Sequence, residues 1–402
     1  MRILFLSPRL CLPLLTGARL REYYLARALG RRAEVTYVSF LPPGFDRPSA
    51  ADLPFFRDIH LVPLSARYSP LKLVRGLVGR WPVTVVNYTT AAMKSTLAGI
   101  VAQHRFDFVH VDGSPMAAYV PYLESTLSAP VRAVYNWHNI DSEVLRRYSG
   151  NVTSWPKKVY AAATARRLAA METQMLHAGF GHAVCSDRER HQLAAIAPNA
   201  RIAVIENGVD TEYFAETVAA AGVRRRIVFV GSMDYYPNIE AVVRFATGTW
   251  PQIREKFPEW CFTIVGSNPA PAILALRGQP GIEVTGTVAD VRSYYRDAIA
   301  AVVPLLTGGG TRLKILEAMA AGVPVVSTSV GAEGLVTAPG KDILLVDNQE
   351  HWLPALVSLS GEDGPRRSLI DAALRLVRSR YDWNMLGARL CEAYSCWLSH
   401  LG

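Results

Sequence analysis

The sequence predicts two successive doubly wound α/β domains, each a parallel sheet with helices on both faces. Short apolar runs rich in valine and isoleucine alternate with longer segments of helical periodicity along the chain. Uninterrupted apolar strands of this kind are typical of parallel sheets, which are buried on both faces. The 402 residues, 50% of them hydrophobic, are enough for two such domains. No apolar run reaches 18 residues, so no membrane-spanning helix is expected.

The predicted strands form two sets on either side of a polar, alanine-rich stretch at residues 211–226. The first set covers residues 3–6, 34–39, 108–111, 131–135, 183–185 and 202–205. The second set covers residues 227–229, 261–265, 282–284, 301–303, 324–327 and 343–346. We therefore expect domains at 1–210 and 211–380 and a C-terminal helix at 381–402 that crosses back onto the first domain. Ligands are expected in a cleft between the domains, at the carboxyl ends of strands.

Charge and cysteine content narrow the function classes. Residues 1–210 carry 25 Lys and Arg against 15 Asp and Glu, whereas residues 211–402 carry 18 against 19. A basic half favours phosphate-bearing substrates or an anionic bilayer. Nucleic acid is not expected as a partner, because zinc-finger spacing, an RNA-binding aromatic signature and long basic runs are all missing from the sequence. Five singly scattered cysteines favour a reduced, cytoplasmic protein.

The densest functional signal is the segment 302–326, where a strand, a glycine-rich loop and a helix follow one another. The strand is expected to end at Pro304 and the helix to begin near Thr311. Between them lie three consecutive glycines, Gly308, Gly309 and Gly310. The backbone N–H groups of such a loop and of a helix N-terminus bind anions.

Three charged residues follow this loop. Arg312 and Lys314 fall in the first helical turn, where the helix dipole disfavours cations unless an anion lies beside them. Glu317 shares a helix flank with Lys314 and suits the hydroxyls of a ribose or sugar. The pattern predicts a bound phosphate, although an ordinary strand–loop–helix turn with a solvated charged face would look similar.

The same segment resembles the donor-binding motif of retaining GT-B glycosyltransferases of family 4, which ends E-A-M-A-x-G-x-P-V-V. Residues 204–214 resemble the family's N-G-V-D-x-x-x-F hinge, residues 229–238 its first C-domain strand and loop, and residues 286–290 its base-binding loop. The resemblance implies a GT-B fold of two Rossmann-like domains and transfer from a nucleotide-sugar donor to a hydroxyl acceptor, a glycan or a lipid-linked sugar, without a cofactor. It also adds Gly231, Ser232 and Val288 to the donor-binding residues.

The sequence departs from the family pattern at two places. The first of two glutamates that the family commonly carries is replaced by Gly309, and the loop at 231–238 lacks the Arg and Lys that often hold the diphosphate. Arg312 and Lys314 are the nearest substitutes. This combination resembles a branch associated with exopolysaccharide loci. A catalytically silent nucleotide-sugar or glycan-binding module is the alternative, and a nucleotide-sugar epimerase would need paired carboxylates that the sequence does not identify.

Two groups of residues in the first half are candidates for the acceptor side. By resemblance to the family's first loop, Gly17 brings its backbone amide to the donor phosphate, with Arg19 or Arg21 adding charge. A plain helix-start turn is the alternative. His138 falls at the carboxyl end of a predicted strand and resembles the family's acceptor-side histidine; a structural histidine is the other interpretation.

Nearby carboxylates have other expected roles. Asp112 ends another predicted strand and is a weaker candidate for the site. Asp141 and Glu143 are expected to cap the helix after His138, Asp141 above all. No Asp-x-Asp motif ends a strand and the histidines are dispersed, so no metal is expected.

The segment 69–81 is a candidate membrane contact. A helix there places apolar residues on one stripe, with basic residues at its margins. The stripe consists of Leu73, Val74, Leu77, Val78 and Trp81, and the margins carry Lys72, Arg75 and Arg80. Such a helix can lie on an anionic bilayer, at the inner face of the cytoplasmic membrane, beside a lipid-linked acceptor. A core-facing helix is the alternative, and a second basic helix at 155–167 fits solvent exposure equally well.

Overall fold

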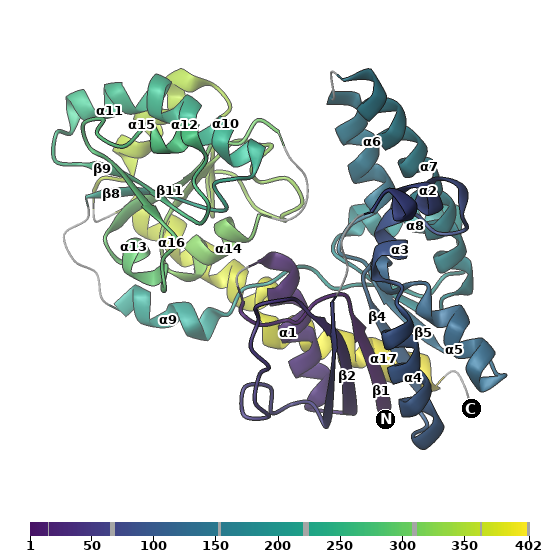
Figure 1. Cartoon of the computed structure of the whole chain (residues 1–402). Helices are drawn as coiled ribbons and strands as arrows, with labels where there is room; N and C mark the ends of the chain where they lie inside the picture. The colour runs from purple at the N-terminus through teal and green to yellow at the C-terminus, as the bar shows by residue number, and fades with distance from the viewer. Residues whose placement is uncertain are drawn as a thin grey trace. The chain divides into compact units, whose positions relative to one another are not determined.

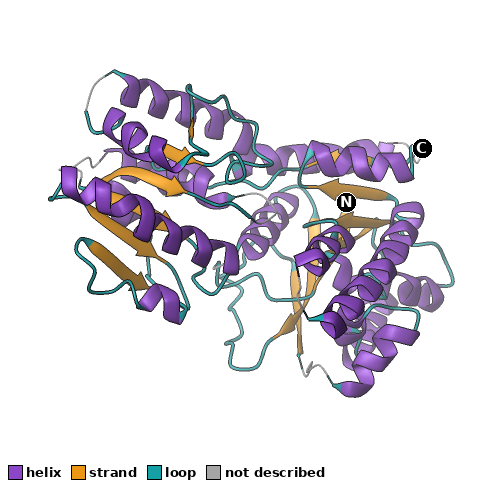
Figure 2. Ribbon diagram, turned by 90° about the horizontal axis from the view of Figure 1, so that it is seen from above, coloured by secondary structure: helices purple, strands orange, loops and turns teal. Residues whose placement is uncertain are grey.

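The computed structural model describes residues 1–14, 16–64, 69–151, 154–219, 225–307, 312–361 and 364–399. The chain forms two compact units. Unit 1 comprises Met1–Glu206 with Leu386–Gly402, and unit 2 comprises Asn207–Met385. Each unit is built on one parallel sheet with helices packed against it, as the alternating pattern predicts (Figures 1 and 2).

Unit 1 has a seven-stranded sheet in the order β3-β2-β1-β4-β5-β6-β7. Its strands are β1 (Arg2–Ser7), β2 (Glu34–Leu41), β3 (Asp58–Pro63), β4 (Phe108–Asp112), β5 (Ala133–Asn136), β6 (Gly181–Val184) and β7 (Ile202–Val204). Its helices are α1 (Gly17–Gly30), α2 (Pro70–Val78), α3 (Val83–Tyr88), α4 (Ala91–Gln103), η1 (Ser114–Met116), α5 (Tyr119–Leu127), α6 (Asp141–Asn151), α7 (Trp155–Ala178), α8 (Asp187–Ile196) and most of α17 (Trp383–Ser399).

Unit 2 has a six-stranded sheet in the order β10-β9-β8-β11-β12-β13. Its strands are β8 (Arg226–Val230), β9 (Cys261–Val265), β10 (Ile282–Gly286), β11 (Ala298–Val303), β12 (Val325–Ser327) and β13 (Leu344–Leu345). Its helices are α9 (Thr211–Ala219), α10 (Tyr236–Arg244), η2 (Phe245–Thr249), α11 (Trp250–Lys256), α12 (Pro271–Leu274), α13 (Arg292–Arg296), α14 (Leu313–Ala320), η3 (Gln349–His351), α15 (Trp352–Ser358), α16 (Pro365–Leu376) and η4 (Val377–Tyr381).

The central strands follow the prediction because they are buried on both faces. In β4 and β11 every residue is buried. The sequence pattern does not predict strand β3. This strand lies at the sheet edge beside β2 and is mostly half-buried, so it tolerates the polar residues Asp58 and His60. The stretch expected as a polar break carries helix α9.

Helix α17 packs against unit 1 from Leu386 onward. The Tyr394 hydroxyl lies 2.6 Å from His110 Nδ1, and the Cys391 thiol donates to the Ala28 carbonyl of α1 at 3.4 Å. A Cβ placed on Gly387 would lie 2.3 Å from the Cβ of Ala28, so the two helices approach as closely as a glycine allows (Figure 1). Among the described residues, no helix has the length and apolar character needed to cross a bilayer.

We therefore expect Gly387→Ala to destabilise the protein by about 1–3 kcal/mol, because the added methyl overpacks the contact between α1 and α17. The matched control is Gly99→Ala in α4, where an added Cβ meets nothing within 4 Å. That change should stabilise by about 0.5–1 kcal/mol, because alanine loses less backbone entropy in a helix. Urea unfolding of the two variants measures both; equal effects would contradict the close helix contact.

Candidate functional site

Each sheet reverses its strand order at one place. In unit 1, β1 lies between β2 and β4, and in unit 2, β8 lies between β9 and β11. At such a point the chain connections leave toward opposite faces of the sheet, and ligands of doubly wound proteins bind at the carboxyl ends of the strands there. The loops after β1, β4, β8 and β11 are therefore where the site residues are sought.

In unit 2, the Lys314 side chain reaches the end of β8 although Lys314 belongs to α14, the helix after β11. Its Nζ donates to Asn238 Oδ1 at 2.9 Å and lies 4.0 Å from the centre of the Phe229 ring. A Cβ placed on Gly231 would lie 2.7 Å from this Nζ. Glycine at 231 thus leaves the space that the ammonium occupies, next to the loop that lacks basic residues of its own.

Arg312, Lys314 and Glu317 form what we call the Lys314 cluster, and burial shifts the pKa of each of them. Burial, helped by the nearby Arg312, lowers the pKa of Lys314 to about 7. Burial raises the pKa of Glu317 to about 7, against the effect of Lys314. Arg312, the residue that precedes the first turn of α14, is 7% exposed, and burial lowers its pKa as well. Desolvated groups of opposite sign with pKa values near 7 are typical of functional sites.

The other residues predicted for the donor side have separate surroundings. Ser232 donates its hydroxyl to Asp234 Oδ1 at 2.6 Å, and its carbonyl accepts from Asn238 Nδ2 at 2.8 Å. Val288 follows β10 and packs, partly buried, on the core of unit 2. The loop residues Gly308, Gly309, Gly310 and Thr311 lie outside the described residues. Helix α14 begins at Leu313, slightly later than expected.

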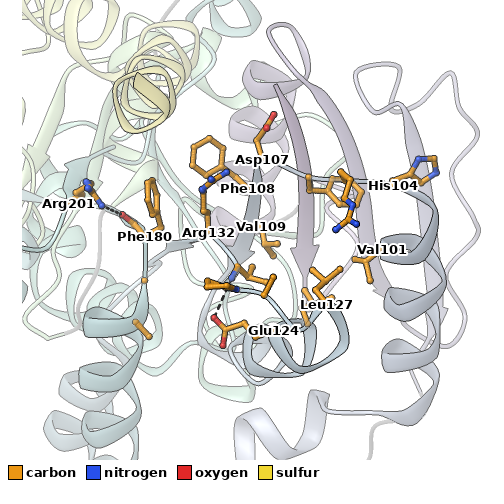
Figure 3. Close-up of a pocket in the computed structure, with 18 residues that line it drawn as sticks. Val101, His104, Asp107, Phe108, Val109, Glu124, Leu127, Arg132, Phe180 and Arg201 are labelled. Carbon is orange, nitrogen blue, oxygen red and sulfur yellow. Dashed lines mark hydrogen bonds between the residues drawn. The ribbon is translucent and has the colours of Figure 1, made fainter. Parts of the chain in front are cut away.

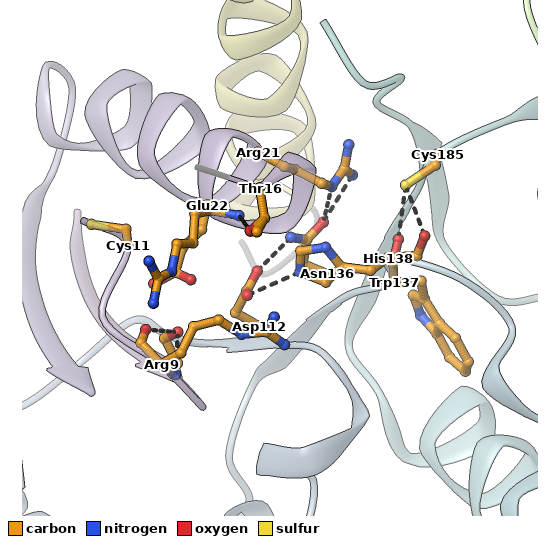
Figure 4. Close-up of polar contacts among 12 residues, drawn as sticks. Arg9, Cys11, Thr16, Arg21, Glu22, Asp112, Asn136, Trp137, His138 and Cys185 are labelled. Atoms are coloured by element: carbon orange, nitrogen blue, oxygen red, sulfur yellow. Dashed lines mark hydrogen bonds and ion pairs between the residues drawn. The ribbon is translucent and has the colours of Figure 1, made fainter. Parts of the chain in front are cut away.

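In unit 1, His138 pairs with Asp112. His138 Nε2 lies 2.9 Å from Asp112 Oδ2; Asp112 is the last residue of β4, and His138 follows the neighbouring strand β5 (Figure 4). The side chain of His138 is 20% exposed, whereas that of Asp112 is 2% exposed. Burial opposes ionisation of Asp112, but His138, His110 and the hydrogen bond from Asn136 outweigh it and hold the pKa of this carboxyl at about 2. His138 therefore forms a hydrogen-bonded pair with Asp112, which was the weaker candidate in the sequence.

Asp112 is linked to a buried arginine through an asparagine. Asn136 Nδ2 donates to Asp112 Oδ1 at 2.6 Å, and Asn136 Oδ1 accepts from Arg21 Nε and Nη2 at 3.1 and 2.8 Å. Arg21 is completely buried, and its Nη1 donates to the carbonyls of Ile205 and Glu206. The predicted phosphate contact at Arg21 is wrong, because this guanidinium is committed to the interior of unit 1.

Glu22, the next residue of α1, is also completely buried. The Tyr37 hydroxyl oxygen lies 2.5 Å from Glu22 Oε1 and 3.0 Å from the Arg9 carbonyl, and it accepts from the Cys11 N–H at 3.2 Å. One hydroxyl proton cannot satisfy both a carbonyl and a carboxylate. A protonated Glu22 resolves this, since it donates to Tyr37 while Tyr37 donates to Arg9. Burial, together with the charge of Asp112, raises the pKa of Glu22 well above 4.5 and favours this neutral form.

The structure also places the other residues for which the sequence predicts a role in unit 1, namely Gly17, Arg19, Asp141 and Glu143. Gly17 is the first residue of α1, which Thr16 caps. Arg19 donates to the Pro13 carbonyl at 3.2 Å and stacks on Phe45. The expected capping role of Asp141 and Glu143 is not what the structure shows. Both lie in the first turn of α6, but the Asp141 carboxylate accepts from the Ser114 hydroxyl and Glu143 pairs with Arg147 and Arg188.

A cavity of about 580 Å³ opens at the opposite ends of the unit 1 strands, beside the starts of β4 and β5 (Figure 3). Arg105, Arg132 and Arg201 line it, and Arg201 stacks on Phe180 at 4.7 Å. Helices α4 and α7 end here, and the negative ends of helix dipoles favour nearby cations. The arginines are thus accounted for without a ligand.

No group of three or more His, Cys, Asp and Glu side chains that could hold a metal ion occurs in the part of the chain that the structure describes.

Two doubly wound units in one chain, with polar groups at the switch point of each sheet, define the GT-B class of fold. Residues 16–213 match the family described as Glycosyltransferase Family 4, and residues 224–361 match the family described as Glycosyl transferases group 1. The chain belongs to this family of glycosyltransferases, which confirms the resemblance of its motifs.

Relatives and solved structures agree with this membership. A phosphatidyl-myo-inositol mannosyltransferase of Mycolicibacterium smegmatis is 26% identical over 73% of this chain and 72% of its own. A 44.6 kDa protein from the cps region of Klebsiella pneumoniae is 22% identical over 39% and 42%. Sucrose-phosphate synthase from Thermosynechococcus elongatus (TM-score 0.70, 17% identity) covers all of both chains. Anabaena HepE in complex with UDP and glucose (TM-score 0.65, 13% identity) covers 98% and 99%. At these identities the solved structures show the shared fold.

The state of Glu22 gives a pH-dependent prediction. The pKa of Glu22 is raised in the folded chain. The stability that neutral Glu22 contributes to the fold is therefore fully present below its ordinary pKa of 4.5 and is lost as the pH rises from there through the raised pKa. Glu22→Gln keeps a neutral donor at this place and should raise the melting temperature at about pH 8 by a few degrees, with little difference near pH 4.

The matched control is Glu34→Gln. Glu34 is exposed, and its hydrogen bond with Arg57 lowers its pKa, so this change should give no gain at pH 8. A pH-independent effect of Glu22→Gln would show that Glu22 is ionised in the folded protein.

Proposed function

We propose that this protein is a retaining glycosyltransferase that moves a sugar from a nucleotide-sugar donor to a hydroxyl acceptor. The Lys314 cluster carries the proposal. A desolvated ammonium beside a buried guanidinium, at the end of β8, suits the diphosphate of such a donor, and both cations become more favourable when an anion arrives. The solved structure of HepE in complex with UDP and glucose supports the choice of donor class.

The difficult step in this reaction is departure of the nucleoside diphosphate. Lys314 and Arg312 stabilise the negative charge that develops on the leaving phosphate, and they do so best in a site from which water is excluded. Glu317 accepts hydrogen bonds from hydroxyls of the donor. His138 binds a hydroxyl of the sugar. With no enzymic nucleophile assigned, the acceptor oxygen bonds to the anomeric carbon from the face that the leaving group vacates, which retains the anomeric configuration. The bond from that carbon to the diphosphate oxygen breaks, and this oxygen takes up the proton of the acceptor hydroxyl.

The cluster predicts how donor binding depends on pH. Lys314 is charged mainly below its pKa of about 7, and Glu317 ionises as the pH rises through about 7. Both changes weaken the attraction for a diphosphate, whose own charge in a nucleotide sugar is fixed. Affinity should therefore fall as the pH rises from about 6 to 8.

Lys314→Met should reduce turnover roughly 10²–10³-fold and flatten the pH dependence of donor affinity. Gly231→Ala, whose methyl group would lie 2.7 Å from the same ammonium, should weaken donor binding while the protein stays folded, because a flexible side chain can move away. Release of nucleoside diphosphate from a panel of UDP-, GDP- and ADP-linked sugars, together with calorimetry, measures both. We propose a metal-independent reaction, so EDTA should leave turnover unchanged.

Lys341→Met, at an exposed position of unit 2, is the control and should change neither quantity. Unchanged turnover in Lys314→Met would refute the phosphate contact. Binding without turnover across the whole panel would favour a catalytically silent module, the alternative that the missing glutamate at Gly309 motivates.

We propose further that the acceptor is a lipid-linked or polymeric glycan of the cell envelope or exopolysaccharide, reached at the cytoplasmic face of an anionic membrane. Two relatives support this: one is a phosphatidyl-myo-inositol mannosyltransferase, and the other comes from a cps region.

Helix α2 is the proposed membrane contact. Its Leu71, Val74 and Val78 are 60%, 55% and 78% exposed, and Arg75 and Arg80 are exposed beside them. The predicted stripe is only partly right. Leu73 is 37% exposed, Trp81 packs against the core of unit 1, and the Leu77 side chain lies outside the described set. At the start of α7, Trp155 and Val159 are 74% and 48% exposed and add apolar surface with Lys158.

The double variant Leu71→Gln/Val78→Gln should bind vesicles of phosphatidylcholine with about one third phosphatidylglycerol roughly tenfold more weakly than the wild type, because two apolar side chains no longer enter the interface. Sedimentation with vesicles measures this. Ile196→Gln/Val336→Gln, at positions 50% and 56% exposed elsewhere, is the matched control. Equal binding of both variants would contradict a contact through α2.

A further inference from the structure

We propose that Asp112, Asn136 and Arg21 form a buried positioning chain that fixes His138 as its Nε2–H tautomer, so that Nδ1 accepts a hydrogen bond from a substrate hydroxyl. The inference rests on the proposed function, in which His138 contacts the sugar. It adds three residues to that function, none of which has to touch the substrate.

The hydrogen bonds of the chain have only one consistent direction. The guanidinium of Arg21 can only donate, so the Asn136 atom that it contacts at 2.8 and 3.1 Å must be the amide oxygen. The amide nitrogen then faces Asp112 Oδ1 at 2.6 Å and donates to it. Reversal of the amide would place a donor against a donor and an acceptor against an acceptor. Asn136 thus transmits the orientation of Arg21 to Asp112.

The far end of the chain is anchored in the main chain. Arg21 Nη1 donates to the carbonyls of Ile205 and Glu206 at 2.6 and 3.1 Å, just after β7 ends. The Glu206 carboxylate in turn accepts from Arg389 of α17 at 3.0 Å. Arg21 therefore does more than balance the charge of Asp112: it is held at several points and cannot swing to another partner.

The tautomer follows from the charge on Asp112. An ionised carboxylate only accepts hydrogen bonds, so His138 Nε2, 2.9 Å from Asp112 Oδ2, must carry the proton. The neutral ring then presents a lone pair at Nδ1, for which no hydrogen-bond partner is found among the described residues. A hydroxyl donates to such an atom, whereas a phosphate or carbonyl oxygen cannot. The other titratable groups that interact with the ring are Asp141 and His110, and those that interact with Asp112 are His110, Glu22 and Cys11.

The experiment observes the ring directly. In protein labelled with ¹⁵N-histidine, two-dimensional NMR near pH 8 distinguishes the Nε2–H and Nδ1–H tautomers of neutral rings, and His138→Gln assigns the signals of His138. We expect the wild type to show the Nε2–H form alone. Asp112→Asn can accept or donate, so it should give a mixture of tautomers or the reversed one. Turnover should fall about 100-fold, with donor affinity, which the Lys314 cluster provides, within about twofold of the wild type.

Asn136→Ser leaves Asp112 and His138 in place and removes the link to Arg21. It should broaden or shift the His138 signals and lower turnover about tenfold, while the tautomer stays mainly Nε2–H. It also replaces Asp112→Asn as the decisive variant if the latter does not fold. Arg21→Met removes the hydrogen-bond donors of Arg21 and should lower turnover. Arg21→Lys keeps a donor but not the planar guanidinium, so it should retain part of the turnover that Arg21→Met loses.

Two results would overturn the proposal: an Nδ1–H tautomer in the wild type, or a His138 signal that neither Asp112→Asn nor Asn136→Ser alters. The NMR measurement needs no substrate, so it remains decisive even if no donor is turned over and the proposed function fails. Conversely, active wild-type protein with an unaltered ring in both variants would reject the positioning chain alone.

Discussion

The placement of the Lys314 ammonium beside the end of β8 is the constraint on which the proposed donor site depends. In the parallel sheet β8 and β11 are neighbours although 67 residues, 231–297, lie between them in the sequence, and the helix after β11 therefore starts close to the loop after β8.

 Those 67 residues, 231–297, connect the two strands, and the sheet brings their ends together again. Gly231 leaves the necessary space and Asn238 supplies the acceptor, so a cation that the β8 loop lacks is provided by another segment.

The switch point of unit 1 holds two buried carboxyl groups, Asp112 and Glu22, whereas the switch point of unit 2 holds buried cations. The surroundings of Asp112 and Glu22 shift their pKa values in opposite directions. Asp112 is ionised because His138 and the amide of Asn136 contact it, whereas at Glu22 burial and the charge of Asp112 outweigh the hydrogen bonds of Tyr37 and Ser7, so that Glu22 stays neutral. Two acids whose environments push their pKa values apart can take different roles in one site. Here the ionised acid contacts His138, and the neutral one contacts Tyr37.

The sequence predicted the parts of the fold that depend on local pattern. Central strands such as β4 and β11 were predicted because every residue in them is apolar or buried, and helix α14 was predicted from its motif. The positioning chain was not. Nothing in the local pattern indicates that Arg21 is buried, and its partner Asn136 lies 115 residues away in the sequence. The position of Lys314 beside Gly231 could not be predicted either, because it depends on the order of the strands in the sheet, which composition and periodicity do not reveal.

Helix α17 begins in unit 2, where the Trp383 N–H donates to the Val209 carbonyl, and continues into unit 1, where Tyr394 meets His110 on the central strand β4. The two halves of the gene therefore do not correspond to the two halves of the protein. A chimera that borrows the second unit of another family member has to exchange the internal segment 207–385 and keep the native C-terminus. A simple fusion after residue 206 would replace the helix that buries one side of the first sheet.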